Sequence, residues 1–176
     1  MAITIVKPNK KIDLGAVEQF EAAVGEKLPD DYREFLLTFN GGKPEDNEFA
    51  IPHGKNEAGV NRFYGLLDER QSGDLLHELE VMVSRIPEKM LLIGDDSSGN
   101  YICLSLRPDT FGQLFFWDHE LEASEGDPAT FSNLFFIDSS FNDFFSKLNK
   151  FDLSQVRLKP GQVKRIWRNP NFKPRF

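Results

Sequence analysis

Apolar residues recur every three or four positions in four segments of the chain, which is the spacing of a helix with one buried face. The predicted helices cover residues 13–24, 28–42 and 74–86, and a last segment that begins at Ser139 or Ser140. Asp13 is a good N-cap for the first helix, and Gly25 follows its last apolar residue. Pro87 ends the third helix because proline cannot continue the hydrogen-bonding pattern.

The segment 28–42 has the clearest helix signals. Pro29 is tolerated in a first turn, and the acidic residues after it suit the positive end of the helix dipole. An apolar stripe runs from Tyr32 to Phe39, and Asn40-Gly41-Gly42 offers a left-handed exit. Since each feature has a structural explanation, we interpret this segment as a folding element.

Elsewhere the pattern changes to short apolar runs separated by turn residues. The predicted strands are 48–51, 60–66, 90–94, 101–106, 113–118 and 134–138. Turn-forming residues between the later strands favour antiparallel hairpins. Helices around hairpin-linked strands predict an α+β domain, with a central antiparallel sheet of about five or six strands and helices packed around it.

The composition is that of an ordinary soluble domain. The 176 residues are 40% hydrophobic and fit one domain, and a single Cys excludes a disulfide within the chain. No apolar run is long enough to span a bilayer, and residues 1–15 lack the apolar core of a signal peptide. These patterns indicate a cytoplasmic protein.

The net charge of −7 conceals an uneven distribution. Residues 1–152 hold all 28 acidic residues and 14 of the 21 basic ones, a net charge of −14. Residues 153–176 hold the other seven basic residues and no acid. An acidic body repels nucleic acid and attracts basic partners. We therefore divide the chain into a domain, 1–152, and a basic, aromatic-containing extension, 153–176.

Four short blocks of sequence stand out between residues 14 and 150. They are L-P-x-x-Y with N-G-G at 28–42, I-G-D-D-S-S-G-N at 93–100, F-F-W-D-H-E at 115–120 and D-S-S-F-N-D-F-F at 138–145. In order and spacing they resemble the SMI1/KNR4 family of the SUKH superfamily. The resemblance implies an α+β fold with a central antiparallel sheet, and a binding module rather than an enzyme. It says nothing of the basic extension.

The resemblance also implies two possible roles. Bacterial members are commonly immunity proteins that bind and neutralise a toxin of a competing cell, often a nuclease. Fungal relatives act as regulatory scaffolds. The sequence therefore predicts an immunity protein that captures a basic toxin, or alternatively a regulatory or scaffolding module with no toxin partner.

Five residues are candidates for the partner-binding surface. Asp95 and Asp96 lie in a turn-forming segment whose simplest role is structural, although they could form an acidic surface. Trp117 is expected in the core or as an aromatic anchor beside Asp118 and Glu120. Residues 95–106 do not fit a calcium loop, because their sixth and twelfth positions are not Gly and Glu.

The patterns of common catalytic and metal sites are absent from the sequence. His53, His77 and His119 are widely separated, and Cys103 lies in a strand where a small buried hydrophobe is expected. We therefore predict no catalytic residue, no metal and no cofactor. A hydrolytic enzyme, the third alternative, would require a deep pocket that holds an acid or histidine with a perturbed pKa.

The extension 153–176 mixes cations with three aromatic residues. This composition can stack on single-stranded nucleic acid or lie on an anionic membrane. Because the acidic body lies beside it, we expect the extension instead to dock on the domain or on a neighbouring chain. The oligomeric state is left open.

Overall fold

The computed structural model describes residues 4–51, 58–68 and 72–150, so the extension 153–176 and His53 lie outside the described residues. The helices are α1 (Leu14–Val24), α2 (Asp30–Phe39), α3 (Leu75–Met82), α4 (Phe141–Lys147) and the short 3-10 helix η1 (His119–Leu121). The strands are β1 (Ile5–Pro8), β2 (Gly42–Pro44), β3 (Glu48–Phe49), β4 (Ala58–Phe63), β5 (Met90–Asp96), β6 (Tyr101–Ser105), β7 (Leu114–Trp117) and β8 (Leu134–Asp138).

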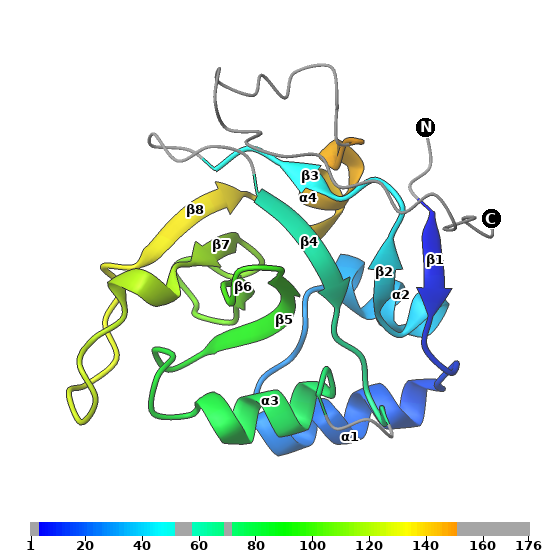
Figure 1. The fold of residues 1–176 in the computed structure, drawn as a ribbon. Coiled ribbons are helices and arrows are strands. Elements are labelled where there is room, and N and C mark those ends of the chain that lie inside the picture. The colour runs from blue at the N-terminus through cyan, green and yellow to red at the C-terminus, as the bar shows by residue number, and fades with distance from the viewer. Residues whose placement is uncertain (1–3, 52–57, 69–71, 151–176) are drawn as a thin grey trace, which may run out of the picture.

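The strands form one antiparallel sheet in the order β1-β2-β4-β5-β6-β7-β8, and β3 pairs with β4 off this path (Figure 1). The α+β prediction is confirmed, but the sheet has eight strands and not five or six. The difference arises from β1 and β2. Each is only three or four residues long, and β2 begins at Gly42, which the sequence indicated as part of a helix exit.

Helices cover both faces of the sheet. Phe116 of β7 contacts Phe49, which contacts Phe144 of α4, with ring centroids 6.2 and 5.1 Å apart. The next residue, Trp117, points to the other face. There the Arg85 guanidinium, just after α3, lies 5.5 Å from its ring centroid. The middle strands β5, β6 and β7 are therefore buried, with α4 on one side and α3 on the other.

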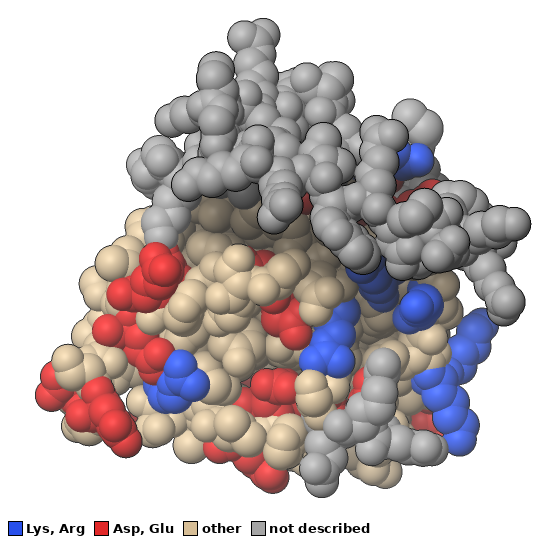
Figure 2. Space-filling view, in the orientation of Figure 1, with Lys and Arg blue, Asp and Glu red and all other residues tan. Residues whose placement is uncertain are grey.

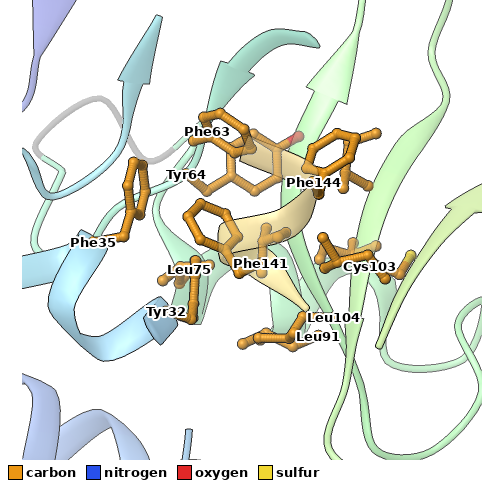
Figure 3. Close-up of a cluster of buried hydrophobic side chains, with 14 of the residues drawn as sticks. Tyr32, Phe35, Phe63, Tyr64, Leu75, Leu91, Cys103, Leu104, Phe141 and Phe144 are labelled. Carbon is orange, nitrogen blue, oxygen red and sulfur yellow. The ribbon is translucent and has the colours of Figure 1, made fainter. Parts of the chain in front are cut away.

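The centre of the core is a cluster of aromatic rings from α2, β4 and α4 (Figure 3). Phe35 lies 4.7 Å from Phe141 and 5.3 Å from Phe63, and Phe63 lies 5.5 Å from Phe141, measured between centroids. Tilted and edge-to-face geometries of this kind are favourable for aromatic pairs. The cluster joins two helices that are about 100 residues apart in sequence to the middle of the sheet.

The predicted helix ends agree with the structure where the signals are local. Asp13 Oδ1 accepts a hydrogen bond from Ala16 N at 3.0 Å, and Gly25 has a φ of 74°. Ser140 caps α4 by accepting from Asp143 N at 3.1 Å. The third helix is shorter than predicted and ends at Met82, after which turns lead to Pro87.

Asn40, Gly41 and Gly42 carry the chain from α2 directly into the sheet. Their φ angles are 51°, 80° and 115°, all in the region that favours glycine. The buried Asn40 side chain donates to Lys10 O and Leu66 O, both at 2.8 Å, and accepts from Leu66 N at 2.7 Å. One side chain therefore ties the end of α2 to two distant segments of backbone.

We expect Asn40→Gly to destabilise the protein strongly, because glycine keeps the left-handed backbone but removes all three side-chain hydrogen bonds. Loss of these bonds leaves buried backbone groups unpaired and should lower the free energy of unfolding by about 2–4 kcal/mol. Denaturant unfolding followed by circular dichroism measures this change. A decrease below about 0.5 kcal/mol would contradict the role given to Asn40.

Glu21 is a buried carboxylate that joins α1 to the start of α2. Its oxygens accept hydrogen bonds from Lys27 Nζ at 2.7 Å, Arg33 Nη1 at 2.9 Å and Leu28 N at 3.0 Å. Burial by itself raises the pKa of Glu21. The bonds from Lys27 and Leu28 and the charge of Arg33 outweigh burial and hold this pKa below its ordinary value of 4.5.

The lowered pKa of Glu21 predicts a pH-dependent contribution to stability. A carboxyl group whose pKa is lower in the folded state stabilises the fold above its unfolded pKa, and this contribution is lost as the pH falls through the folded pKa. Glu21→Gln should therefore lower the free energy of unfolding by about 1–3 kcal/mol at pH 7, with the difference from wild type shrinking below pH about 4.5.

The control is Glu18→Gln, on the exposed side of the same helix, which should change stability by less than about 0.5 kcal/mol. Urea unfolding of the three proteins at several pH values measures both effects. Equal stability of wild type and Glu21→Gln at pH 7 would show that the buried carboxylate contributes nothing.

Candidate functional site

A groove of about 610 Å³ opens where β3, the start of β4, the β5–β6 turn and the end of β7 meet. Its described lining residues are Asn47, Glu48, Ile51, Ala58, Gly59, Asp96, Ser97, Ser98, Asn100, Phe116, Asp118, His119 and Glu120. The lining is mostly polar, and its apolar part includes Ile51 and Phe116. We call this feature the acidic groove.

The β5–β6 turn forms one wall and is held in shape by Asp96. Asp96 Oδ1 accepts from Ser98 N at 2.7 Å and from Asn100 N at 2.9 Å, and its Oδ2 accepts from Asn100 Nδ2 at 2.8 Å. Asp at such a position commonly folds a turn in this way. Through these hydrogen bonds Asp96 sets the shape of the turn. Because its carboxylate is also partly exposed, it adds negative charge to the groove.

The end of β7 forms a second wall. Asp118 is 2% exposed, and its Oδ1 accepts from Glu120 N at 3.0 Å, which caps η1. The backbone N–H of the exposed His119 donates to Asn100 Oδ1 at 3.1 Å, and its Nδ1 lies 2.8 Å from the same oxygen. Asn100 thereby joins the two walls, and Glu120 is left exposed at the edge.

The third wall comes from β3, more than 45 residues earlier in the chain. Asn47 and Glu48 lie against Gly59 of β4, and a Cβ atom on Gly59 would lie 2.9 Å from Glu48 Oε1. The absence of a side chain at Gly59 therefore leaves room for these two polar groups. Asn47 Nδ2 also donates to Val60 O at 3.3 Å.

The acidic groove carries a one-sided charge. Among its described lining residues four are acidic, Glu48, Asp96, Asp118 and Glu120, and none is Lys or Arg. On a larger scale, Figure 2 shows Asp and Glu gathered on the side of the molecule where β8 and the preceding loop lie, with Lys and Arg concentrated on the side of β1. The groove can therefore attract a cationic group.

The structure brings three of the five predicted residues together in the groove: Asp96, Asp118 and Glu120. Asp95 does not line it. Its carboxylate accepts from Asn61 Nδ2 at 2.9 Å and Tyr64 Oη at 3.1 Å, and lies 3.3 Å from Arg62 Nε. Arg62 thereby offsets the charge of Asp95.

Trp117 is fully buried in the structure, so its ring is not available at the surface to contact a partner. Of the two positions expected for Trp117, the core and an aromatic anchor at the surface, the structure has the core position. Sequence reasoning missed Asn47 and Glu48, because nothing in their local sequence indicates that β3 pairs beside the β5–β6 turn. Of the groove acids, Glu120 is the most exposed and Asp118 the least.

The groove residues do not form a familiar catalytic arrangement. In the described part of the chain, no hydrogen bond joins Ser97 or Ser98 to His119, and the His119 ring instead contacts Asn100. Cys103 is completely buried, and burial raises the pKa of its thiol, so the reactive thiolate is disfavoured.

Across 4–51, 58–68 and 72–150, no three His, Cys, Asp or Glu side chains gather closely enough to hold a metal ion. Over the same residues, each helix is too short or too polar to cross a bilayer.

Comparison with known proteins agrees with the motifs. One relative is the SPbeta prophage-derived uncharacterized protein YokK of Bacillus subtilis (strain 168), which is 26% identical over 149 residues, or 75% of this chain and 72% of that protein. The SMI1 / KNR4 family (SUKH-1) matches residues 11–147, a span that includes α1 to α4 and all three walls of the acidic groove. The chain therefore belongs to the SMI1/KNR4 family.

Proposed function

We propose that this chain is a non-catalytic binding protein, and that it acts in the cytoplasm as an immunity protein against a basic toxin of bacterial competition. The observation that carries the proposal is the acidic groove, where four acidic residues line a concave surface and no Lys or Arg is found among the described lining residues. Membership of the SMI1/KNR4 family supports a protein partner.

The proposed mechanism begins with electrostatic attraction. Residues 1–152 carry a net charge of −14, and such a charge accelerates the association with a basic protein. A nuclease is one toxin class that fits, because it must itself attract nucleic-acid phosphates with basic residues. Bound in the groove, the toxin's basic surface would no longer be open to its substrate.

The second step is docking on a surface that is already shaped. Three hydrogen bonds to Asp96 hold the β5–β6 turn, and Asn100 joins that turn to His119 at the end of β7. A preorganised surface loses little conformational freedom on binding, which favours affinity. Glu120 is exposed on this frame and is the groove acid best placed to meet an incoming cation.

Replacement of Glu120 by Lys should weaken partner binding, because it reverses the charge of the most exposed groove acid. In the described structure the Glu120 side chain makes no hydrogen bond, so the replacement removes none. The expected loss of affinity is about tenfold or more, equivalent to about 1.4 kcal/mol. The test co-expresses the protein with toxins encoded beside its gene, and measures cell survival and toxin affinity.

The matched control is Glu80→Lys, an equal charge change at an exposed position of α3, which does not line the groove. This variant should protect cells as well as wild type. Equal protection by both variants would contradict the groove as the binding surface. If no adjacent toxin gene exists and no toxin is suppressed, the immunity role fails and the scaffolding alternative is favoured.

A further inference from the structure

The chain carries its own basic segment, residues 153–176, with seven Lys or Arg residues, no acid and the aromatic residues Trp167, Phe172 and Phe176. Its charge is opposite to that of residues 1–152. A segment of this composition has the same chemistry as the basic partner proposed for the acidic groove. The segment can bind there only if the residues that precede it lie close to the groove.

The described chain ends at the wall of the groove. Glu48 and Asn149 form a pair of backbone hydrogen bonds, each 2.9 Å long, and Glu48 lines the groove. The next residue, Lys150, places its Nζ 3.8 Å from Asp46 Oδ1 and 3.9 Å from Glu45 Oε1. Asn149 and Lys150, which precede the basic segment in the sequence, therefore lie beside the third wall in an acidic environment.

Asp46 offers a further attraction for a cation at this point. Its Oδ1 atom is shielded from solvent and accepts no hydrogen bond from the described residues. The Asp46 side chain as a whole is 29% exposed, and a nearby cation offsets the cost of shielding this one oxygen from water. Lys150 is the nearest cation that the described residues provide, and its side chain is 71% exposed.

The tether makes even a weak attraction effective. Residues 153–176 can extend over roughly 80 Å, which is ample to reach and cross a groove that lies beside their starting point. A tethered segment of this kind has an effective concentration near its site of about a millimolar. Nucleic acid and anionic membranes are less favoured binding partners for the segment. The acidic body next to the segment repels the phosphates of both.

We propose that residues 153–176 bind in the acidic groove of the same chain, where they compete with the basic partner. The competitive consequence rests on the proposed function, but the docking itself does not. Only a partner that binds more tightly than the tethered segment displaces it, so the segment raises the threshold for binding and protects the groove from weak basic ligands. The attraction is electrostatic and weakens at high salt.

A spin label on the segment tests the docking in the full chain without any partner. Asn171→Cys introduces a thiol for the label in the segment, while Cys103 is buried and remains unlabelled. The label should broaden the NMR signals of amides at Ser97, Ser98 and Glu120 and leave Glu80 on α3 unaffected. A mixture of spin-labelled chains and unlabelled ¹⁵N chains should show no broadening, since the contact is within one chain.

Two variants connect the broadening to charge. Replacement of Lys164, Arg165 and Arg168 together by Gln should restore the signals, and so should Glu120→Lys, whereas Glu80→Lys should not. A labelled peptide with the sequence of residues 153–176 should bind the triple variant about tenfold more tightly than wild type, as expected if the segment occupies the groove in about nine of ten molecules.

The outcomes separate this inference from the proposed function. Broadening at the groove without toxin suppression supports the docking and removes only the competition with a toxin. Toxin suppression without broadening leaves the proposed function in place and overturns the docking. Broadening only in the mixed sample, or binding of the full chain to single-stranded oligonucleotides or anionic vesicles with none at the groove, also overturns it.

Discussion

Three consecutive residues with left-handed backbone angles, Asn40, Gly41 and Gly42, hold the helical and β parts of the fold together. A Cβ atom on Gly41 would lie 2.7 Å from Phe63 O, and one on Gly42 would lie 2.3 Å from Lys7 O, so the backbones of β1, β2 and β4 approach closely only because these residues are glycine. This contact fixes the position of α2, and α2 presents Phe35 to the aromatic core. The N-G-G block of this chain thus has a physical explanation that needs no partner.

The acidic groove depends on this frame. β4 pairs with β2 and β3 along one edge and with β5 along the other, so it connects the Asn40–Gly42 region to two elements that line the groove, β3 and the end of β5. The acids that line the groove are not equivalent. Asp96 and Asp118 shape a turn and a helix start, whereas the Glu120 side chain is exposed and takes part in neither. An acidic surface built on structural carboxylates keeps its shape before a partner arrives.

The opposite charges of residues 1–152 and 153–176 have one explanation in the two proposals taken together. The groove carries acidic residues, and the cationic segment 153–176 follows closely in sequence after Asn149, which pairs with Glu48 of the groove wall. A binding protein with a strong charge faces many weak ligands of opposite charge. A tethered segment of its own raises the affinity that a ligand needs, and specificity is a difference of affinities of this kind.

The sequence by itself determined the helix starts, the α+β class, the family blocks and the imbalance of charge, because these depend on residues a few positions apart or on composition. The caps at Asp13 and Ser140 are examples, since each bonds to a backbone group three residues away. Only the tertiary structure decided which acids lie together. Strand pairing brings Glu48 beside Asp96 and Glu120, buries Trp117, and lets Arg62 offset Asp95. These outcomes follow from contacts between strands that are separated in the sequence, and no local pattern records which distant strand a short segment such as β3 will join.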